Sequence, residues 1–201
     1  LASRRQRQMC IRDRIYIIMN LTGKLLISMP SLEDERFYKT VIYMCAHSTE
    51  GAMGIIINKK IDYDLYPDLL EQLGIDKPLG GKKLYIRYGG PVESGRGFVL
   101  HSDEVIQKET LTIEKGVALT STSEFFEDLS NGKGPKNSIL ALGYAGWGGG
   151  QIEKEILANS WMTLSAEPTF LFDEEVTNKW NNAYKLIGVD PNKLSQYSGR
   201  A

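Results

Sequence analysis

A pair of strand-like runs joined by a short link is the feature that most constrains the fold of this chain. The runs VIYMCAH (Val41–His47) and GIIIN (Gly54–Asn58) are rich in apolar and β-branched residues. The link between them contains a glycine, and two such runs separated by only a few residues predict a β-hairpin. Because a hairpin pairs its strands antiparallel, a regular doubly wound parallel sheet is disfavoured.

Further strands and helices are predicted on both sides of this hairpin. Strands are expected at Lys24–Met29, Leu84–Tyr88, Gly97–His101, Leu111–Ile113, Val117–Leu119 and Ser138–Tyr144. Helices are expected between about residues 62 and 74, after a capping box at Ser121 and Glu124, over 151–160, and from Asp173 to Ile187. This mixture indicates an α+β fold, or α/β with a mixed sheet. We expect a single compact domain in which helices flank a mixed β-sheet.

The first eighteen residues differ in character from this domain. Residues 4–14, RRQRQMCIRDR, contain five arginines and resemble a translated sequencing adapter. The stretch lacks the long apolar core of a secretory signal and the serine-rich, amphipathic character of a transit peptide. We therefore expect residues 1–18 to be a non-native or disordered tail, Met19 to be the natural start, and residues 19–201 to form the domain.

Without this tail the chain is acidic, which bears on its partners. The whole chain has 24 Lys and Arg, 25 Asp and Glu, and a net charge of −1. Removing the five arginines and one aspartate of the tail leaves 19 basic and 24 acidic residues, and so a net charge of −5. Nucleic-acid binding is disfavoured, because it depends mostly on basic residues. No apolar run approaches the roughly 20 residues of a membrane span, and a cytoplasmic location is expected.

Cysteine and histidine offer few possibilities for catalysis or metal binding. Cys45 is the only cysteine outside the tail and lies in an apolar run, so a buried, inert thiol is favoured over a redox-sensitive or catalytic one. His47 and His101 could supply half a metal site, but the spacing of neither matches a known metal motif. We therefore expect no metal and no cofactor.

A glycine-rich stretch, GYAGWGGGQIEKE (Gly143–Glu155), lies between a predicted strand and a predicted helix. It could cradle a phosphate at the helix N-terminus, but Gln151 breaks the dinucleotide-binding pattern and no Walker lysine follows. Glu153 and Glu155 would occupy the start of the helix, where they suit its dipole and would repel a phosphate. A tight packing turn is therefore preferred, with Trp147 as a wedge.

The strand-end loops form the remaining candidate site. The segment Pro30–Arg36, the end of the hairpin at His47, the loop Gly89–Arg96 and the stretch Gly143–Gln151 are turn-rich with polar tips, where binding residues tend to collect. If they converge, the pocket would be formed by His47, Asn58, Gly90, Arg96, His101 and Trp147.

Several unusual strings, in this order, resemble the YqgE/AlgH family of bacterial proteins. They are LISMPSLEDERFYKTVIYMCAHSTEGAMGIIINK, YGGPVESGRGFVLH, LGYAGWGGGQIEKEILANSWM and KLIGVDPNKLSQYSGRA. The resemblance covers about residues 20–201. It implies a compact α+β domain of the bacterial cytosol with a possible, indirect link to regulation. It supplies no catalytic residues, because the family has no established activity.

Two functions follow as hypotheses, and a third is disfavoured. A non-enzymatic regulatory or interaction domain, with a protein partner or a second copy of itself, is favoured because no catalytic constellation is recognisable. A small-molecule binder or enzyme with its pocket at the strand-end loops is the alternative. Direct DNA binding rests on the family resemblance alone and conflicts with the negative charge of the domain.

Overall fold

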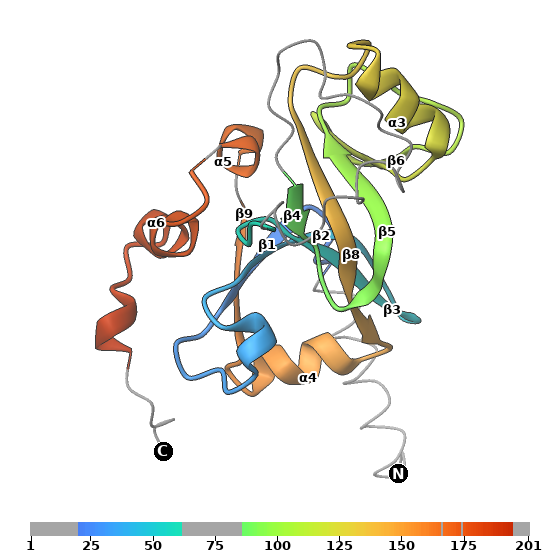
Figure 1. The fold of residues 1–201 in the computed structure, drawn as a ribbon. Coiled ribbons are helices and arrows are strands. Elements are labelled where there is room, and N and C mark those ends of the chain that lie inside the picture. The colour runs from blue at the N-terminus through green and yellow to red at the C-terminus, as the bar shows by residue number, and fades with distance from the viewer. Residues whose placement is uncertain (1–19, 62–85, 166, 174, 195–201) are drawn as a thin grey trace, which may run out of the picture.

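A strongly curled sheet forms the centre of the protein in the computed structural model, which describes residues 20–61, 86–165, 167–173 and 175–194 (Figure 1). Its strands are β1 (Lys24–Ser28), β2 (Val41–Ser48), β3 (Gly51–Ile56), β4 (Ile86–Tyr88), β5 (Val92–His101), β6 (Leu111–Glu114), β7 (Val117–Thr120), β8 (Ser138–Gly148) and β9 (Trp161–Ser165). They lie in the order β6-β7-β5-β8-β3-β2-β1-β9, with β4 paired to β8. Among these named strands only β4 and β8 pair in parallel, so the predicted α+β class with a mixed sheet is confirmed.

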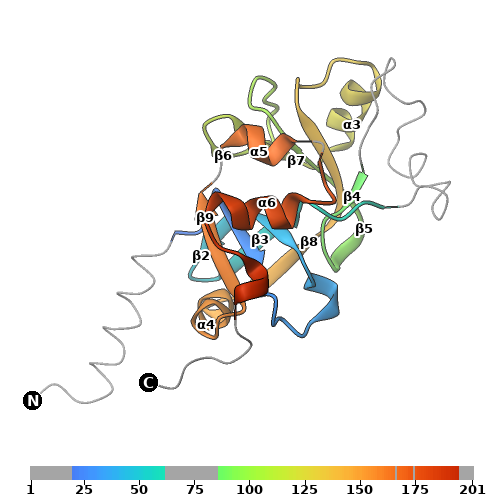
Figure 2. The ribbon, with the colours of Figure 1, turned by 90° about the vertical axis from the view of Figure 1, so that its left-hand side faces the viewer.

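Short helices cover the sheet. They are η1 (Glu35–Phe37), α3 (Ser123–Ser130), α4 (Gln151–Leu157), α5 (Pro168–Phe172), α6 (Lys179–Leu186) and η4 (Pro191–Lys193). Figure 2 shows α6 lying across the strands with α5 above it, and Figure 1 shows α4 beneath the lower end of β8. None of the helices in the described residues is long and apolar enough to cross a membrane.

The predicted hairpin is confirmed, with a shorter turn than the sequence indicated. β2 and β3 pair antiparallel, and Ser48 pairs with Gly51, so only Thr49 and Glu50 lie between the strands. The register shifts between Met44 and Ala46, which marks a β-bulge in β2. The turn of the hairpin therefore consists of two residues, Thr49 and Glu50.

The curl of the sheet encloses the largest apolar cluster. The cluster combines inward-facing residues of β1, β2, β3, β5, β7 and β8 with Leu171 of α5 and Trp180, Ala183 and Tyr184 of α6. The Tyr43 hydroxyl of β2 donates to Glu114 Oε1 of β6 at 2.6 Å, although these strands are far apart in the sheet order. Burial, reinforced by Glu114, raises the pKa of Tyr43.

Two smaller clusters pack on the other side of the sheet. Phe125, Phe126 and Leu129 of α3 pack on β4, β5 and β8. Ile152 and Ile156 of α4 pack on β1, β2, β3 and the last part of β8. The curled sheet thus has α5 and α6 on its inner side, and α3 and α4 at different places on its outer side.

Gly143 reverses the side-chain alternation of β8. Before it, Leu140 and Leu142 face α3, and Ala141 faces the inner cluster. After it, Tyr144 packs against the inner cluster and Trp147 faces α4. Even-numbered residues therefore change sides at Gly143, whose φ of 67° lies in the left-handed region that favours glycine.

The backbone of Gly89 and Gly90 packs against β8 at Gly143. Gly89 donates its N–H to Leu142 O at 2.8 Å and accepts the N–H of Ile56 on its carbonyl at 2.9 Å, so it bridges β8 and β3. A Cβ on Gly89 would collide with the carbonyl of Gly143, and one on Gly143 would collide with that of Gly90. The backbones approach this closely only because these three residues have no side chain.

Some predicted elements have different limits in the structure. β8 extends to Gly148, so the predicted glycine-rich turn shrinks to Gly149 and Gly150. β5 begins at Val92, so most of the predicted loop Gly89–Arg96 is strand. The prediction missed the strand β9 and the helix α5. The helix predicted between residues 62 and 74, and residues 84–85 of one predicted strand, lie outside the described residues.

Two helix starts also differ from the prediction. α3 is capped by Thr122, whose hydroxyl accepts the N–H of Phe125, and not by Ser121. α6 begins at Lys179 and not after Asp173, although the predicted buried face at Trp180, Ala183 and Tyr184 is present. Local capping patterns placed both helices but missed their first residue by one or several positions.

Lys179 is buried between α5 and α6 and is only 1% exposed. Its ammonium group donates to the carbonyls of Phe170 at 2.6 Å and Leu171 at 3.3 Å, near the end of α5, and lies 4.9 Å from the centre of the Phe170 ring. Burial lowers the pKa of Lys179 to about 8, although Asp173 opposes this shift. The lysine thus bonds α5 to α6 at the cost of a desolvated charge.

A first prediction concerns Gly143. Gly143→Ala should lower the free energy of unfolding by roughly 2–4 kcal/mol, because it combines left-handed strain with a backbone collision. Gly188→Ala has a positive φ of 69° but open space around it, and Gly95→Ala has open space and no left-handed φ. Urea unfolding should rank the losses as Gly143, Gly188, Gly95, and equal losses for all three would contradict the close approach.

A second prediction concerns the pH dependence of stability. The pKa of Lys179 is about 8 when folded and near 10.5 when exposed, so the cost of the buried ammonium is complete below pH 8 and disappears as the pH rises to 10.5. The stability of the natural chain relative to Lys179→Met should therefore rise across this window. Urea unfolding at both ends of the window measures it. The exposed Lys185→Met is the control, and a constant difference for Lys179→Met would refute the burial effect.

Candidate functional site

An open cleft of about 470 Å³ lies at the end of the hairpin β2–β3. It is lined by Ala46, Ser48, Glu50, Gly51, Ala52, Met53, Val92, Tyr144, Gly146 and Trp147. Three of the four segments that the sequence singled out contribute to it: the end of the hairpin, the segment Gly89–Arg96 through Val92, and the stretch Gly143–Gln151. The segment Pro30–Arg36 does not.

The cleft lies on one face of a three-stranded platform formed by β2, β3 and the last part of β8. β3 pairs with both neighbours here, Ala52 with His47 on β2 and with Trp147 on β8. Met53 and Tyr144 pack toward the inner cluster, whereas Ala52 and Trp147 belong to the cluster that packs on α4. Met53 and Tyr144 therefore lie on the face of the platform opposite α4, while Ala52 and Trp147 border the cleft and also contact the α4 side.

His47 attaches the hairpin to α4. Its Nδ1 accepts the N–H of Leu21 at 3.2 Å, so this nitrogen carries no proton, and Nε2–H donates to Glu153 Oε1 at 2.8 Å. Both side chains are buried, with 5% of His47 and 7% of Glu153 exposed. Glu153 Oε2 is also buried, and no group within the described residues forms a hydrogen bond with it. His47, which was predicted to line the pocket, thus bonds the platform to α4.

Glu155 attaches β8 and β9 to the same helix. Its Oε2 accepts the indole N–H groups of Trp147 at 3.0 Å and Trp161 at 2.8 Å, and its Oε1 accepts an N–H of Gln151 at 2.9 Å. The two indole rings meet edge to face, 6.1 Å apart. Glu153 and Glu155 were predicted to serve the helix dipole, but the structure shows them as acceptors that hold the platform on α4.

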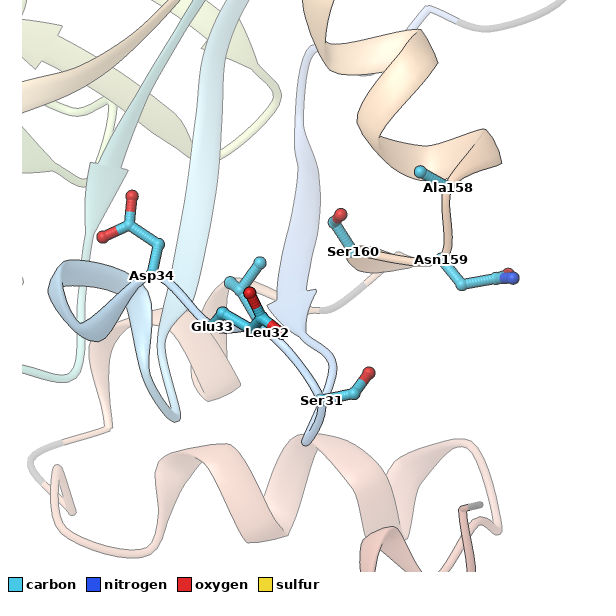
Figure 3. Close-up of a pocket in the computed structure, with 7 residues that line it drawn as sticks. All are labelled: Ser31, Leu32, Glu33, Asp34, Ala158, Asn159 and Ser160. Carbon is cyan, nitrogen blue, oxygen red and sulfur yellow. The ribbon is translucent and has the colours of Figure 1, made fainter. Parts of the chain in front are cut away.

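The Pro30–Arg36 segment lines a second pocket, at the other end of α4. This pocket has a volume of about 310 Å³ and is lined by Ser31, Leu32, Glu33, Asp34, Ala158, Asn159 and Ser160. Figure 3 shows the Ser31–Asp34 segment facing the Ala158–Ser160 turn. The Arg36 guanidinium pairs with Asp34 at 2.7 Å and lowers the pKa of that carboxyl. The cleft and this second pocket therefore divide the four predicted segments between them.

The remaining candidates from the loops have structural partners. Asn58 Oδ1 accepts the N–H of Val41 at 2.8 Å, and its amide donates to Lys39 O at 2.9 Å. Gly90 provides the close approach to β8. Arg96 lies on the surface, where it pairs with Glu93 at 3.1 Å. None of these three residues lines the cleft.

His101 is buried at the other end of the sheet. Its Nδ1–H donates to the Ser102 carbonyl at 3.0 Å, and its Nε2 accepts from the Thr120 hydroxyl at 2.9 Å. Its ring packs against Phe125 of α3 at 4.5 Å. Burial lowers the pKa of His101. The imidazole is thus a neutral part of the packing between β5, β7 and α3.

The two histidines cannot share a metal. His101 pairs with Ser138 at the start of β8, whereas Ala52, the partner of His47, pairs with Trp147 near its end. At ~3.3 Å per residue, the two points are roughly 30 Å apart along the strand. No group of three or more His, Cys, Asp or Glu within the described part of the chain could hold a metal ion.

Cys45 is buried in the inner cluster, as the sequence predicted, and is 1% exposed. Burial raises the pKa of the thiol to about 12, and its Sγ lies 3.6 Å from the Tyr43 carbonyl. Nucleophilic attack and oxidation both proceed through the thiolate, which this environment disfavours at neutral pH.

The residues that define the cleft and its support were not predicted in these roles from the sequence. Met53 and Glu50 line the cleft, and Glu153 and Glu155 hold the platform from behind. A strand residue such as Met53 gives no local signal of its exposure, because the side of the sheet that it faces is covered or left open by distant segments of the chain. Glu153 and Glu155 were recognised in the sequence, but their partners lie on the strands β2, β8 and β9, and the sequence does not reveal which residues of these strands meet α4.

Comparison with known proteins agrees with the fold and the motif order. The family model described as AlgH-like, DUF179, matches residues 25–192. A UPF0301 protein of Bradyrhizobium diazoefficiens is 48% identical over 189 residues, with 90% of this chain and 88% of that protein covered. A UPF0301 protein of Nitrobacter hamburgensis is 49% identical, with the same coverage.

Two solved structures share the fold. The AlgH protein of Pseudomonas aeruginosa superposes with a TM-score of 0.73 at 35% identity, covering 92% of this chain and 97% of that one. Protein DIP2367 of Corynebacterium diphtheriae gives a TM-score of 0.61 at 19% identity, over 86% and 92% of the two chains, and shows the fold alone. The family model covers most of the chain and the relatives are close, so the chain belongs to the AlgH-like DUF179 family of uncharacterised bacterial proteins.

Proposed function

We propose that this chain is a non-enzymatic interaction domain whose cleft takes up an extended segment of a partner protein. The observation that carries the proposal is the shape and lining of the cleft at the end of the hairpin. It is open and exposes Met53, Val92 and Tyr144 beside glycines and alanines. An open surface of this kind suits a chain segment that runs past it more than an enclosed small ligand.

The support behind the cleft is consistent with a binding role. Recognition by a shallow surface requires a rigid floor, because ordering a mobile one on binding costs free energy. Here the platform is bonded to α4 at two places, by Glu153 through His47 and by Glu155 through Trp147. Both carboxylates thus stiffen the floor and do not project into the cleft.

The state of the reactive groups also favours binding over catalysis. His47 and His101 each use both ring nitrogens in hydrogen bonds within the protein. The Cys45 thiol is buried and protonated. A nucleophile or general base must reach a substrate, and these three groups do not line the cleft. A regulatory role would then act through a protein partner.

Small-molecule binding is the second candidate. The two pockets, of about 470 and 310 Å³, both fall within the usual range of ligand sites, and the second one is lined by hydroxyl, amide and carboxylate groups. Native mass spectrometry of the protein purified gently from cells would detect a retained small molecule. Such a mass, lost on substitution of Asn159 and Ser160 but not of Met53, would favour this function at the second pocket.

A third prediction tests the cleft. Short random peptides displayed on phage should be enriched by the folded chain, and Met53→Ala should weaken the enriched peptides about tenfold, because the buried apolar anchor of an interface contributes more than 1 kcal/mol. Val92→Asn should act in the same direction. Affinities are measured by fluorescence anisotropy, and thermal unfolding shows that each variant is folded.

The matched control is Leu157→Asn, because Leu157 is 72% exposed on α4 and lies outside the cleft. It should leave peptide affinity unchanged. Three outcomes would overturn the proposal: no peptide is enriched, the enriched peptides bind all variants equally, or the cleft variants instead dissociate a dimer of the chain, which would assign the cleft to a second copy.

A further inference from the structure

The cleft has an uneven charge distribution. Of its ten lining residues, Glu50 alone carries a charged side chain, and the others are apolar, small or neutral. Glu50 is exposed at the tip of the hairpin, where its N–H donates to Ser48 Oγ at 3.2 Å. Within the described residues, no ion pair involves Glu50. Its carboxylate is therefore accessible to a ligand that carries a positive charge.

From this arrangement we infer that the segment bound in the cleft carries a Lys or Arg that pairs with Glu50, close to an apolar residue that packs against Met53 and Tyr144. The inference rests on the proposed function, since it specifies the class of segment that the cleft takes up. It also gives the bound segment an orientation, with its basic residue at the tip of the hairpin and its apolar residue toward β8.

The geometry of β3 fixes the spacing between these two residues. Met53 follows Glu50 by three positions and pairs with Ala46, while Gly51 pairs with Ser48 at the start of the turn. Three residues of extended chain span roughly 10 Å. An extended partner lying over the face of the platform, along β3, covers this distance in about the same number of residues. The basic residue should thus lie about two to four positions from the apolar one.

The neighbouring charges do not compete for the same position. Glu93 is the other acid near Val92, and it is paired with Arg96 at 3.1 Å. Arg96 also donates to Ser121 Oγ at 3.0 Å and lies over the Phe98 ring. The guanidinium of this arginine is therefore held against Ser121 and Phe98, and its charge is balanced by Glu93. A cation that enters the cleft meets Glu50 as the uncompensated partner.

The experiment uses the peptides enriched on the full chain. They should share a Lys or Arg two to four positions from a large apolar residue. Glu50→Lys should weaken these peptides about fivefold at low salt and less at high salt, since the pair is exposed and screened. Exchanging the basic residue of the peptide for Glu should restore binding to Glu50→Lys, a rescue that a merely structural role of Glu50 would not give.

The control is Glu109→Lys, which makes the same charge change at an exposed residue outside the cleft. It should leave affinity and peptide preference unchanged. Peptides that depend on Met53 but lack a basic residue, or that bind Glu50→Lys and the natural chain equally, would overturn this inference and leave the proposed function standing. Enrichment of no peptide would overturn both.

Discussion

The backbone contact between Gly89–Gly90 and Gly143 is the constraint on which the rest of the structure depends. Gly89 bridges β3 and β8 by two hydrogen bonds, and the carbonyls of this segment and of Gly143 lie where a Cβ would otherwise be. Here β8 stops pairing with β4 and starts pairing with β3. One long strand can therefore belong to both halves of the curled sheet, because three residues without side chains meet at its turning point.

The reversal of alternation at Gly143 carries this constraint to the candidate site. Because the residues after it change sides, Tyr144 faces the inner side and Trp147 faces α4. A strand with unbroken alternation would turn Trp147 inward, away from Glu155. Tyr144 of the cleft and the Trp147 ring that bonds to α4 thus lie on opposite faces of one platform as a consequence of the left-handed Gly143.

Several polar side chains of the molecule form hydrogen bonds within the protein and link its elements to one another. His47, His101, Glu153, Glu155 and Lys179 are all bonded within the protein, between elements that are distant in the sequence. Such buried polar contacts specify which elements meet, since an unpaired partner would be costly. The cleft at the end of the hairpin differs from these sites, because its lining is small or apolar apart from one acid at its rim.

The sequence by itself determined the elements whose signal is local. The hairpin, the buried face of α6, the burial of Cys45 and the α+β class follow from apolar runs, periodicity and turn residues, and the ordered motifs placed the chain in its family. Only the tertiary structure decided where β8 changes sides, that Glu153 and Glu155 bond to His47 and Trp147, and that Met53 and Glu50 line a cleft without the Pro30–Arg36 segment. The physical reason is range. Periodicity and capping are properties of neighbouring residues, whereas a bulge, a close backbone approach and a buried carboxylate depend on strands that come together only in the folded chain.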